Sequence, residues 1–239
     1  MKVSKPFVFK KFTVKQDRCA LKVNTDAVLL GALAEAKNPD NIMDIGTGTG
    51  VISLMLAQRF PHALIHGVEI ESNAFTQTLE NFSESPWAER LVISHLPFQE
   101  MADNCDKKFD LIVSNPPYYK DHLKTLIPER NIALHSEFLT FDELSEGVMK
   151  ILSKNGEFFA ILPERQMMLL EECLAERGLH PGSKMTILDR PGAQTLRVIQ
   201  SFGFRARRVA DLKEIFIKDS EGNYSVEYAT LLRDFLLIF

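Results

Sequence analysis

The sequence predicts an α/β fold built on a doubly wound, mostly parallel sheet of seven strands, one of them antiparallel. Short apolar runs typical of buried strands alternate five times with segments that have the apolar spacing of helices. Two further strand-like runs, 184–189 and 195–202, then follow each other with no helix between them. The alternation is typical of parallel βαβ units, and the closing pair favours an antiparallel strand near one side of the sheet.

The expected elements can be placed in chain order. Residues 7–23 alternate apolar and polar side chains and predict a short β-hairpin. The expected strands are 42–45, 64–70, 91–95, 109–114 and 156–162, before the two runs named above. The expected helices are 27–36, with N-cap side chains at 24–26; 51–60; 72–82, capped by Ser72; 139–152, with Thr140 or Asp142 near its start; and 164–177, ended by Gly178. The tail predicts a last strand pair within 214–226 and a short helix over 228–239.

The chain is expected to form a single domain over 1–239. An N-terminal basic cap at about 1–36 and a C-terminal extension at about 209–239, which would cover the sheet edge, belong to it. The composition, 45% hydrophobic and 25% charged, is that of an ordinary soluble globular protein. No apolar run approaches the ~20 residues that span a bilayer, and the N-terminus lacks the apolar core of a signal peptide. We therefore expect a cytoplasmic protein. We also expect a monomer.

A metal site is not expected. The three cysteines lie far apart with no CxxC spacing, and His66, His95 and His135 have no carboxylate or cysteine at ligand spacing. Buried or incidental thiols are the simpler interpretation.

Basic residues gather at two places in a chain whose formal net charge is −4. Residues 1–22 contain one acid and seven basic residues, which are Lys2, Lys5, Lys10, Lys11, Lys15, Arg18 and Lys22. A second cluster consists of Arg205, Arg207 and Arg208. Local basic patches bind phosphates even in an acidic chain, so all of these residues except Lys2 and Lys5 are candidate nucleic-acid contacts. A solvated basic edge that keeps a terminal hairpin soluble explains the charges equally well.

The tetrapeptide Asn115-Pro116-Pro117-Tyr118 directly follows the expected strand 109–114. Open α/β sheets hold their ligands just beyond the carboxyl ends of the strands. The two prolines fix φ and remove two backbone donors, which leaves carbonyls and one amide side chain to accept hydrogen bonds. An acceptor surface followed by an aromatic ring suits a planar group that carries an NH2. A proline-rich turn with an exposed tyrosine is the alternative.

A glycine turn follows the first central strand, at Gly46, Gly48 and Gly50. Glycine permits positive φ and a close approach of a ligand, and the turn opens a helix whose free N–H groups favour carboxylate or anionic groups. The spacing GxGxG differs from the dinucleotide loop GxGxxG, because Val51 occupies the place of its third glycine. With Asp44 two residues before the first glycine, the turn favours a different cofactor.

Glu69 ends the next expected strand, where adenosine-binding α/β folds place an acid that accepts hydrogen bonds from ribose hydroxyls. For this residue alone, a solvated charge at a strand end is the alternative. Its combination with the glycine turn and Asn115 favours a ligand site at one edge of the sheet.

These residues resemble a known family. The run Asp44-Ile45-Gly46-Thr47-Gly48-Thr49-Gly50, with Glu69 and Asn115-Pro116-Pro117-Tyr118, is similar to the class I S-adenosylmethionine-dependent methyltransferases, whose fold is Rossmann-like. The NPPY signature belongs to the members that methylate planar NH2 or amide nitrogens. The segment Lys22–Gly31, the doubled Tyr118-Tyr119 and the lack of an N-terminal helical domain resemble the bacterial tRNA1(Val) (adenine(37)-N6)-methyltransferases, over about residues 7–204.

The resemblance implies transfer of a methyl group from S-adenosylmethionine to the N6 of an adenine in tRNA, adenine 37 of tRNA1(Val). The implied catalytic residues are Asn115, Pro116, Pro117 and Tyr118. The implied cofactor-binding residues are Asn24, Thr25, Asp44, Gly46, Thr47, Gly48, Gly50, Glu69, Ile70 and Phe98. Asp44 would lie near the cofactor ammonium, Glu69 would hold the ribose, and Asn24 and Thr25 would close over the cofactor.

The chain departs from the family pattern after its third strand. Many such enzymes place an acid there to bind the cofactor adenine, whereas His95-Leu96-Pro97-Phe98-Gln99 contains none. Phe98 is expected to pack on the adenine instead, with Gln99 or a backbone group in place of the acid.

Other acceptors suit the same motif. A glutamine side-chain amide of a protein such as a release factor also carries a planar NH2, but that family has an extra N-terminal helical domain, and residues 1–23 here predict a basic hairpin. Guanine N2 of ribosomal RNA and adenine in DNA are further alternatives. A non-catalytic cofactor-binding module would need neither Asn115 nor Tyr118.

Overall fold

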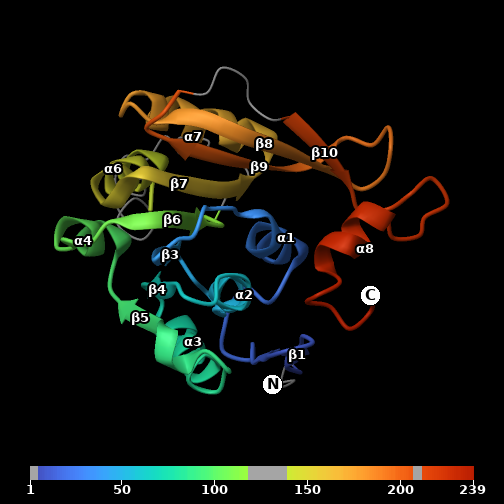
Figure 1. The fold of residues 1–239 in the computed structure, drawn as a ribbon, viewed down its shortest axis with the longest axis horizontal. Helices are drawn as coiled ribbons and strands as arrows, with labels where there is room; N and C mark the ends of the chain where they lie inside the picture. The colour runs from blue at the N-terminus through green and yellow to red at the C-terminus, as the bar shows by residue number, and fades with distance from the viewer. Residues whose placement is uncertain (1–4, 118–138, 207–211) are drawn as a thin grey trace, which may run out of the picture.

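An eight-stranded sheet runs through the protein, and helices pack on both of its faces (Figure 1). The computed structural model describes residues 5–117, 139–206 and 212–239. Within these residues the strand order is β10-β8-β9-β7-β6-β3-β4-β5. The strands are β3 (Asn41–Ile45), β4 (Leu64–Glu69), β5 (Leu91–His95), β6 (Phe109–Ser114), β7 (Leu152–Leu162), β8 (His180–Leu188), β9 (Thr195–Gly203) and β10 (Leu212–Phe216).

The predicted fold class is confirmed. β9 runs antiparallel to both of its neighbours, β7 and β8, and every other neighbouring pair in the described sheet is parallel. The predicted number of seven strands is wrong by one, because β10 pairs with β8 as an additional edge strand. Three of the five β10 residues are exposed, so this strand lacks the apolar run that marks a buried one.

The helices divide between the two faces of the sheet. On one face lie α1 (Thr25–Leu33), α2 (Val51–Arg59) and α3 (Ser72–Ser83), and on the other lie α4 (Phe98–Asp103), α6 (Phe141–Ile151) and α7 (Glu164–Ala175). The remaining described elements are the hairpin β1 (Phe7–Val8) and β2 (Thr13–Val14), the short 3-10 helix η1 (Ala88–Arg90) and α8 (Val226–Leu232). None of the described helices combines the length and the apolar character needed to cross a bilayer.

A side chain caps the start of α1, α3, α6 and α8, whereas α2, α4 and α7 begin without a side-chain cap. The Asn24 side chain accepts a hydrogen bond from the Ala27 N–H and caps α1, as predicted. Thr140 caps α6 in a capping box with Glu143. The prediction of Ser72 as the cap of α3 is wrong, because the Glu71 carboxylate accepts from the first free N–H groups of that helix.

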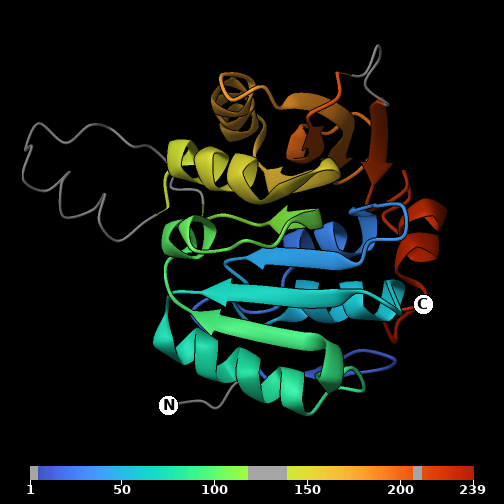
Figure 2. The ribbon, with the colours of Figure 1, turned by 60° about the vertical axis from the view of Figure 1, so that its left-hand side comes forward.

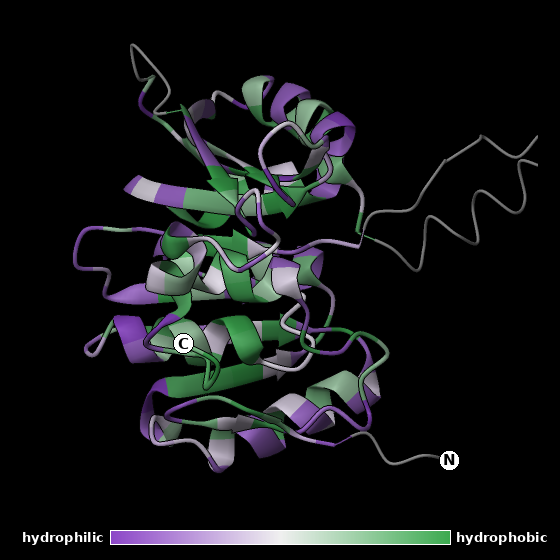
Figure 3. Cartoon of the chain, turned by 90° about the vertical axis from the view of Figure 1, so that its right-hand side faces the viewer, coloured by the Kyte–Doolittle hydropathy of each residue, from purple (hydrophilic) through white to green (hydrophobic). Residues whose placement is uncertain are grey.

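Alternation along the strands builds one apolar core on each face. In β3, Ile42 joins the core beneath α1 and α2, whereas Met43 and Ile45 join the core beneath α4, α6 and α7. Apolar residues accordingly concentrate on the central strands (Figure 3). Asp44 interrupts this pattern as a fully buried charge facing the first turn of α2.

Candidate functional site

The carboxyl ends of three adjacent strands meet at one edge of the sheet. Ile45 at the end of β3 is in register with Val68 of β4 and with Ser114 of β6. The Ser114 hydroxyl donates to the Ile45 carbonyl at 3.2 Å. The glycine turn and the segment Asn115–Pro117 therefore leave neighbouring strands at the same level, at the edge where the strand arrowheads end in Figure 2.

The glycine turn leaves open space at its first position. Gly46, Gly48 and Gly50 have φ of 68°, 59° and 79°, a left-handed conformation that favours glycine. Among the described residues, and apart from its chain neighbours, a Cβ atom on Gly46 would have no neighbour within 4 Å, whereas one on Gly50 would lie 2.7 Å from the Phe82 ring. Gly50 is thus required for packing, and Gly46 leaves a space that a ligand could fill.

Asp44 has one satisfied and one unsatisfied carboxylate oxygen. Its Oδ2 atom accepts hydrogen bonds from the Thr47 hydroxyl at 2.7 Å, the Ser53 hydroxyl at 2.7 Å and the Ser53 N–H at 3.2 Å. Its buried Oδ1 atom has no partner among the described residues. Burial raises the pKa of Asp44 to about 6, although the hydrogen bonds from Thr47 and Ser53 act in the opposite direction. A cationic group beside Oδ1 would offset this cost.

Thr47 and Ser53 hold the Asp44 carboxylate by hydrogen bonds. Both are buried, and both hydroxyls donate to Asp44. Thr47 is among the residues predicted at the cofactor, whereas Ser53 is not. The only sequence signal for Ser53 is its position in the first turn of the helix after the glycine turn, where an N–H has no partner within the helix.

The Glu69 carboxylate ties the end of β4 to the glycine turn. Its Oε2 atom accepts from the Gly48 N–H at 2.9 Å, and its Oε1 atom accepts from the N–H groups of Ile70 and Glu71, both at 2.9 Å. Ile70 beside it is 55% exposed, which is unusual for a large apolar side chain next to a buried strand. The two residues thus offer a carboxylate and an apolar surface side by side.

Phe98 lies in the core rather than at the surface. It is 5% exposed, belongs to the apolar cluster beneath α6, and its ring occupies the space that a Cβ atom on Gly147 would need. The predicted contact between Phe98 and the cofactor adenine stays a prediction.

The segment Asn115–Pro117 begins beside the glycine turn. Asn115 is half-buried, Pro116 is buried and Pro117 is exposed, and Tyr118 lies outside the described residues. Asn24 and Thr25 are exposed at the start of α1, and the Asn24 side chain is occupied as its cap. An ion pair of 2.6 Å between Asp26 and Arg197 joins this end of α1 to the beginning of β9.

The basic residues predicted to contact nucleic acid do not lie together. Some lie near the glycine turn, and others lie near the amino ends of the strands. Lys15, Arg18 and Lys22 belong to the segment that leads to the start of α1. Lys15 forms ion pairs of 2.8 and 2.6 Å with Glu80 and Glu84, and Arg18 lies 3.6 Å from Glu80. Exposed ion pairs of this kind are weak, so phosphates can exchange for these carboxylates.

Lys10 and Lys11 lie in the β1–β2 turn, beside the C-terminal residues. The Lys10 ammonium donates to the carbonyls of Arg233 and Phe239 at 2.5 and 2.7 Å. This part of the tail is also bound by Gln58, close to the end of α2 that points away from the glycine turn. Arg207 and Arg208 lie outside the described residues.

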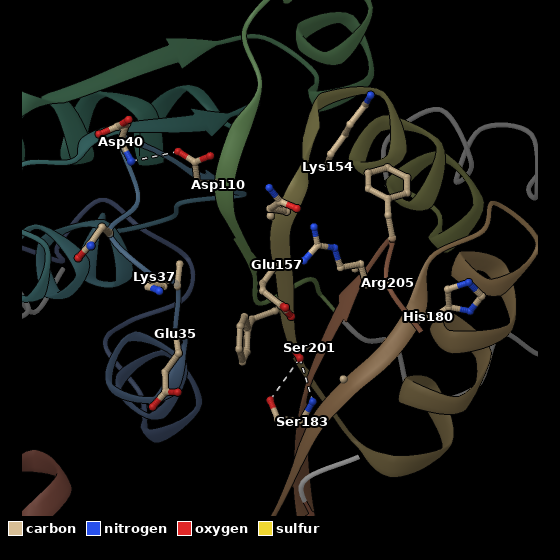
Figure 4. A pocket seen from close by; sticks show the side chains of 18 of the residues that line it. Glu35, Lys37, Asp40, Asp110, Lys154, Glu157, His180, Ser183, Ser201 and Arg205 are labelled. Atoms are coloured by element: carbon tan, nitrogen blue, oxygen red, sulfur yellow. Dashed lines mark hydrogen bonds between the residues drawn. The ribbon is translucent and has the colours of Figure 1, made fainter. Parts of the chain in front are cut away.

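Arg205 lines a cavity at the opposite edge of the sheet (Figure 4). The cavity has a volume of about 1110 Å³, and its lining includes Asp40 before β3, Asp110 in β6 and His180 in β8. These residues lie at the amino ends of their strands. The cavity is thus remote from the glycine turn, and its charges are of both signs. In residues 5–117, 139–206 and 212–239 no group of His, Cys, Asp and Glu side chains could hold a metal ion.

The chain is similar to known methyltransferases. A family model described as the methyltransferase small domain matches residues 22–168. A protein of Phocaeicola vulgatus named tRNA1(Val) (adenine(37)-N6)-methyltransferase is 41% identical over 235 residues, which cover 97% of both chains. A protein of the same name from Christiangramia forsetii is 39% identical over 237 residues, which cover 98% of both chains.

Solved structures share the fold. The structure of a predicted O-methyltransferase from Agrobacterium tumefaciens has a TM-score of 0.67 at 18% identity, and the match covers 88% of this chain and 96% of that one. The chain therefore belongs to the methyltransferase small domain family and is an S-adenosylmethionine-dependent methyltransferase.

Proposed function

We propose that this enzyme transfers the methyl group of S-adenosylmethionine to the N6 atom of an adenine in tRNA, adenine 37 of tRNA1(Val), as the names of its relatives state for them. The observation that carries the proposal is the register of β3 and β6, which starts the glycine turn and Asn115 from neighbouring strand ends. A donor on the turn and an amine at Asn115 would then be adjacent. We further propose that the enzyme acts in the cytoplasm as a monomer.

The residues at the glycine turn fit the methyl donor. The unpaired Asp44 Oδ1 suits the donor's cationic methionine end, the open space at Gly46 admits a close approach to the backbone, and the Glu69 carboxylate suits ribose hydroxyls. Ile70 offers an exposed apolar surface next to Glu69. When bound, S-adenosylmethionine supplies a sulfonium methyl group that a nitrogen lone pair can attack.

Asn115 and Pro116 would activate the acceptor nitrogen. The N6 lone pair of adenine is delocalised into the ring and is weakly nucleophilic. The Asn115 side-chain oxygen and the Pro116 carbonyl would accept the two N6 hydrogens, which favours a pyramidal nitrogen with a localised lone pair. The same dipoles stabilise the positive charge that grows on the nitrogen, because they are oriented before the reaction begins. The methylated nitrogen is acidic enough to lose its proton to water, so no dedicated base is needed.

The target adenine must leave its stack to reach this segment. Base flipping costs a few kcal/mol in a duplex and less in an unpaired loop. In the proposal the ring of Tyr118, which lies outside the described residues, stacks on the flipped base and contributes about 1–3 kcal/mol. Replacement of Tyr118 by alanine would then weaken RNA binding more than donor binding.

A transfer assay on several acceptors tests the proposed function. The purified protein is incubated with donor carrying a radiolabelled methyl group and with tRNA, ribosomal RNA, DNA or release factor. We expect label in tRNA alone, recovered as N6-methyladenosine. Label on a release-factor glutamine or on guanine N2 of ribosomal RNA would establish one of the alternative functions instead.

Donor affinity is expected to fall as the pH drops through about 6. Asp44 is ionised above its pKa of about 6 and neutral below it, and only the ionised form attracts the cationic donor. The donor dissociation constant should therefore rise by up to about tenfold from roughly pH 7 to roughly pH 5, as measured by calorimetry. The Asp44→Asn variant should bind weakly at both pH values, and a pH dependence that persists in this variant would contradict the assignment.

The affinity for tRNA is expected to be salt-dependent. Each neutralised phosphate releases counterions, so a plot of log K against log salt has a slope set by the number of phosphate contacts. Lys22→Ala should reduce the slope by about one, as one lost phosphate contact does. Lys154→Ala, at the cavity on the opposite edge, should leave the slope unchanged. Equal slopes for wild type and Lys22→Ala would remove Lys22 from the RNA interface.

A further inference from the structure

The buried face of α3 is polar. An amphipathic helix normally turns apolar side chains toward the core. In α3 the buried residues are Ala74, Gln77, Thr78, Asn81 and Phe82, and the three polar ones are 0%, 0% and 2% exposed. Each of these three forms hydrogen bonds, so the structure satisfies the polar groups that it buries.

Thr78 holds the peptide group at the centre of the glycine turn. Its hydroxyl donates to the Gly48 carbonyl at 2.5 Å, and the Cys19 thiol lies 3.6 Å from the same oxygen. The Gly48 N–H donates to Glu69 at 2.9 Å. Gly48 is therefore fixed from both sides, with its φ of 59° between the two attachments.

Asn81 joins the glycine turn to the N-terminal segment. Its amide nitrogen donates to the Thr49 carbonyl at 2.8 Å and to the Lys15 carbonyl at 2.9 Å, and its oxygen accepts from the Lys15 N–H at 2.9 Å. Gln77 accepts from the Arg18 N–H at 3.0 Å. Residues 15–19 belong to no described strand, so these side-chain amides replace a strand partner for their backbone.

We infer that Thr78 and Asn81 are positioning residues for methyl-donor binding: they set the conformation of the glycine turn and hold residues 15–19 against it as the outer wall of the donor site. Cys19 belongs to this wall: its side chain is 8% exposed and its thiol lies beside the Gly48 carbonyl. The inference rests on the proposed function only in taking the glycine turn as the place where the donor binds. Beyond the proposed function, it assigns control of donor affinity to α3, a helix that carries none of the family motifs.

A matched set of substitutions on one helix tests Thr78. Thr78→Val keeps the shape of the side chain and removes the hydroxyl, whereas Thr78→Ser keeps the hydroxyl. Thr76→Val is the control, because Thr76 is exposed on the same helix and, among the described residues, its hydroxyl donates only to the Ser72 carbonyl. We expect Thr78→Val to raise the dissociation constant of S-adenosylmethionine and its KM by about tenfold, equivalent to ~1.4 kcal/mol. Turnover at saturating donor should stay within about twofold of wild type, since the transfer step itself does not use Thr78.

The outcomes separate this inference from the proposed function. If the wild type binds no S-adenosylmethionine in the calorimeter, the proposed function fails. If the wild type binds and Thr78→Val binds equally well, or if Thr78→Ser loses as much affinity as Thr78→Val, the positioning role is wrong. A lower melting temperature of Thr78→Val with unchanged affinity would likewise assign Thr78 to stability alone.

Thiol labelling tests Asn81. Asn81→Ala removes the bonds to Lys15 and Thr49, so residues 15–19 should separate from the turn and expose Cys19. Burial raises the pKa of this thiol to about 12 in the native protein, which makes it slow to react. We expect labelling of Cys19 to become at least about tenfold faster in Asn81→Ala, measured against Cys19→Ser to subtract the other two thiols. An unchanged labelling rate in a folded Asn81→Ala variant would overturn the role of Asn81.

Discussion

Asn115→Ala is expected to lower turnover by about 10²-fold or more, the range for removal of one preorganised electrostatic group. The side-chain oxygen that accepts an N6 hydrogen is lost, so the nitrogen lone pair stays delocalised and the growing positive charge loses one of its two stabilising dipoles. The donor dissociation constant should remain within about twofold of wild type, because Asp44, Glu69 and the glycine turn are untouched. Single-turnover methylation of tRNA, with donor binding measured by calorimetry, gives both quantities.

Two variants sharpen this test. Asn115→Asp keeps an oxygen acceptor at the same position and should retain more activity than Asn115→Ala. Asn155→Ala removes an asparagine from the cavity at the opposite edge and should be fully active. Methylation of tRNA by Asn115→Ala at the wild-type rate would show that residue 115 does not take part in the reaction.

Gly46→Ala is expected to weaken donor binding by about 10- to 100-fold. Apart from its chain neighbours, the added methyl group meets no atom of the described residues within 4 Å, so it enters the space assigned to the donor. Crowding a well-packed contact costs about 1–3 kcal/mol, which corresponds to this range. Calorimetric titration with S-adenosylmethionine measures the change directly.

Gly192→Ala is the matched control for backbone strain. Gly192 has a φ of 79°, close to the 68° of Gly46, and a Cβ atom there also has no non-adjacent neighbour within 4 Å in the part of the chain that the structure describes. Both variants should therefore lose similar stability from a left-handed alanine, about 1–2 kcal/mol. Only Gly46→Ala should lose donor affinity. Equal donor affinity in the two variants would place the donor away from Gly46.

The order of the central strands and helices could be predicted because each signal is local. Parallel strands buried on both faces leave continuous apolar runs, and the caps at Asn24 and Thr140 lie within a few residues of the helices that they start. β10 escaped prediction as a member of the main sheet because an exposed edge strand has no such run. α4 also escaped, since it has only six residues and no capping side chain, and depends on burial of Phe98, Met101 and Ala102.

The sequence could indicate which strand ends carry the candidate site, because three closely spaced glycines and two successive prolines are local signals. In the structure the three glycines have positive φ, and Asp44 before them is buried. Thr78 and Asn81 could not be predicted, because polar side chains on a helix are normally exposed and only the packed structure shows that this face is buried. The positions of the basic residues could not be predicted either, because the sequence does not show that Lys10 contacts the C-terminal tail and Lys15 contacts α3.

Nucleoside analysis of tRNA from cells with and without this gene tests the central claim most directly. We predict that N6-methyladenosine disappears from tRNA1(Val) when the gene is absent, returns when the wild-type gene is restored, and does not return with Asn115→Ala. An unchanged level of N6-methyladenosine without the gene, or full restoration by Asn115→Ala, would contradict the claim that an adenine amine meets the methyl donor between the ends of β3 and β6.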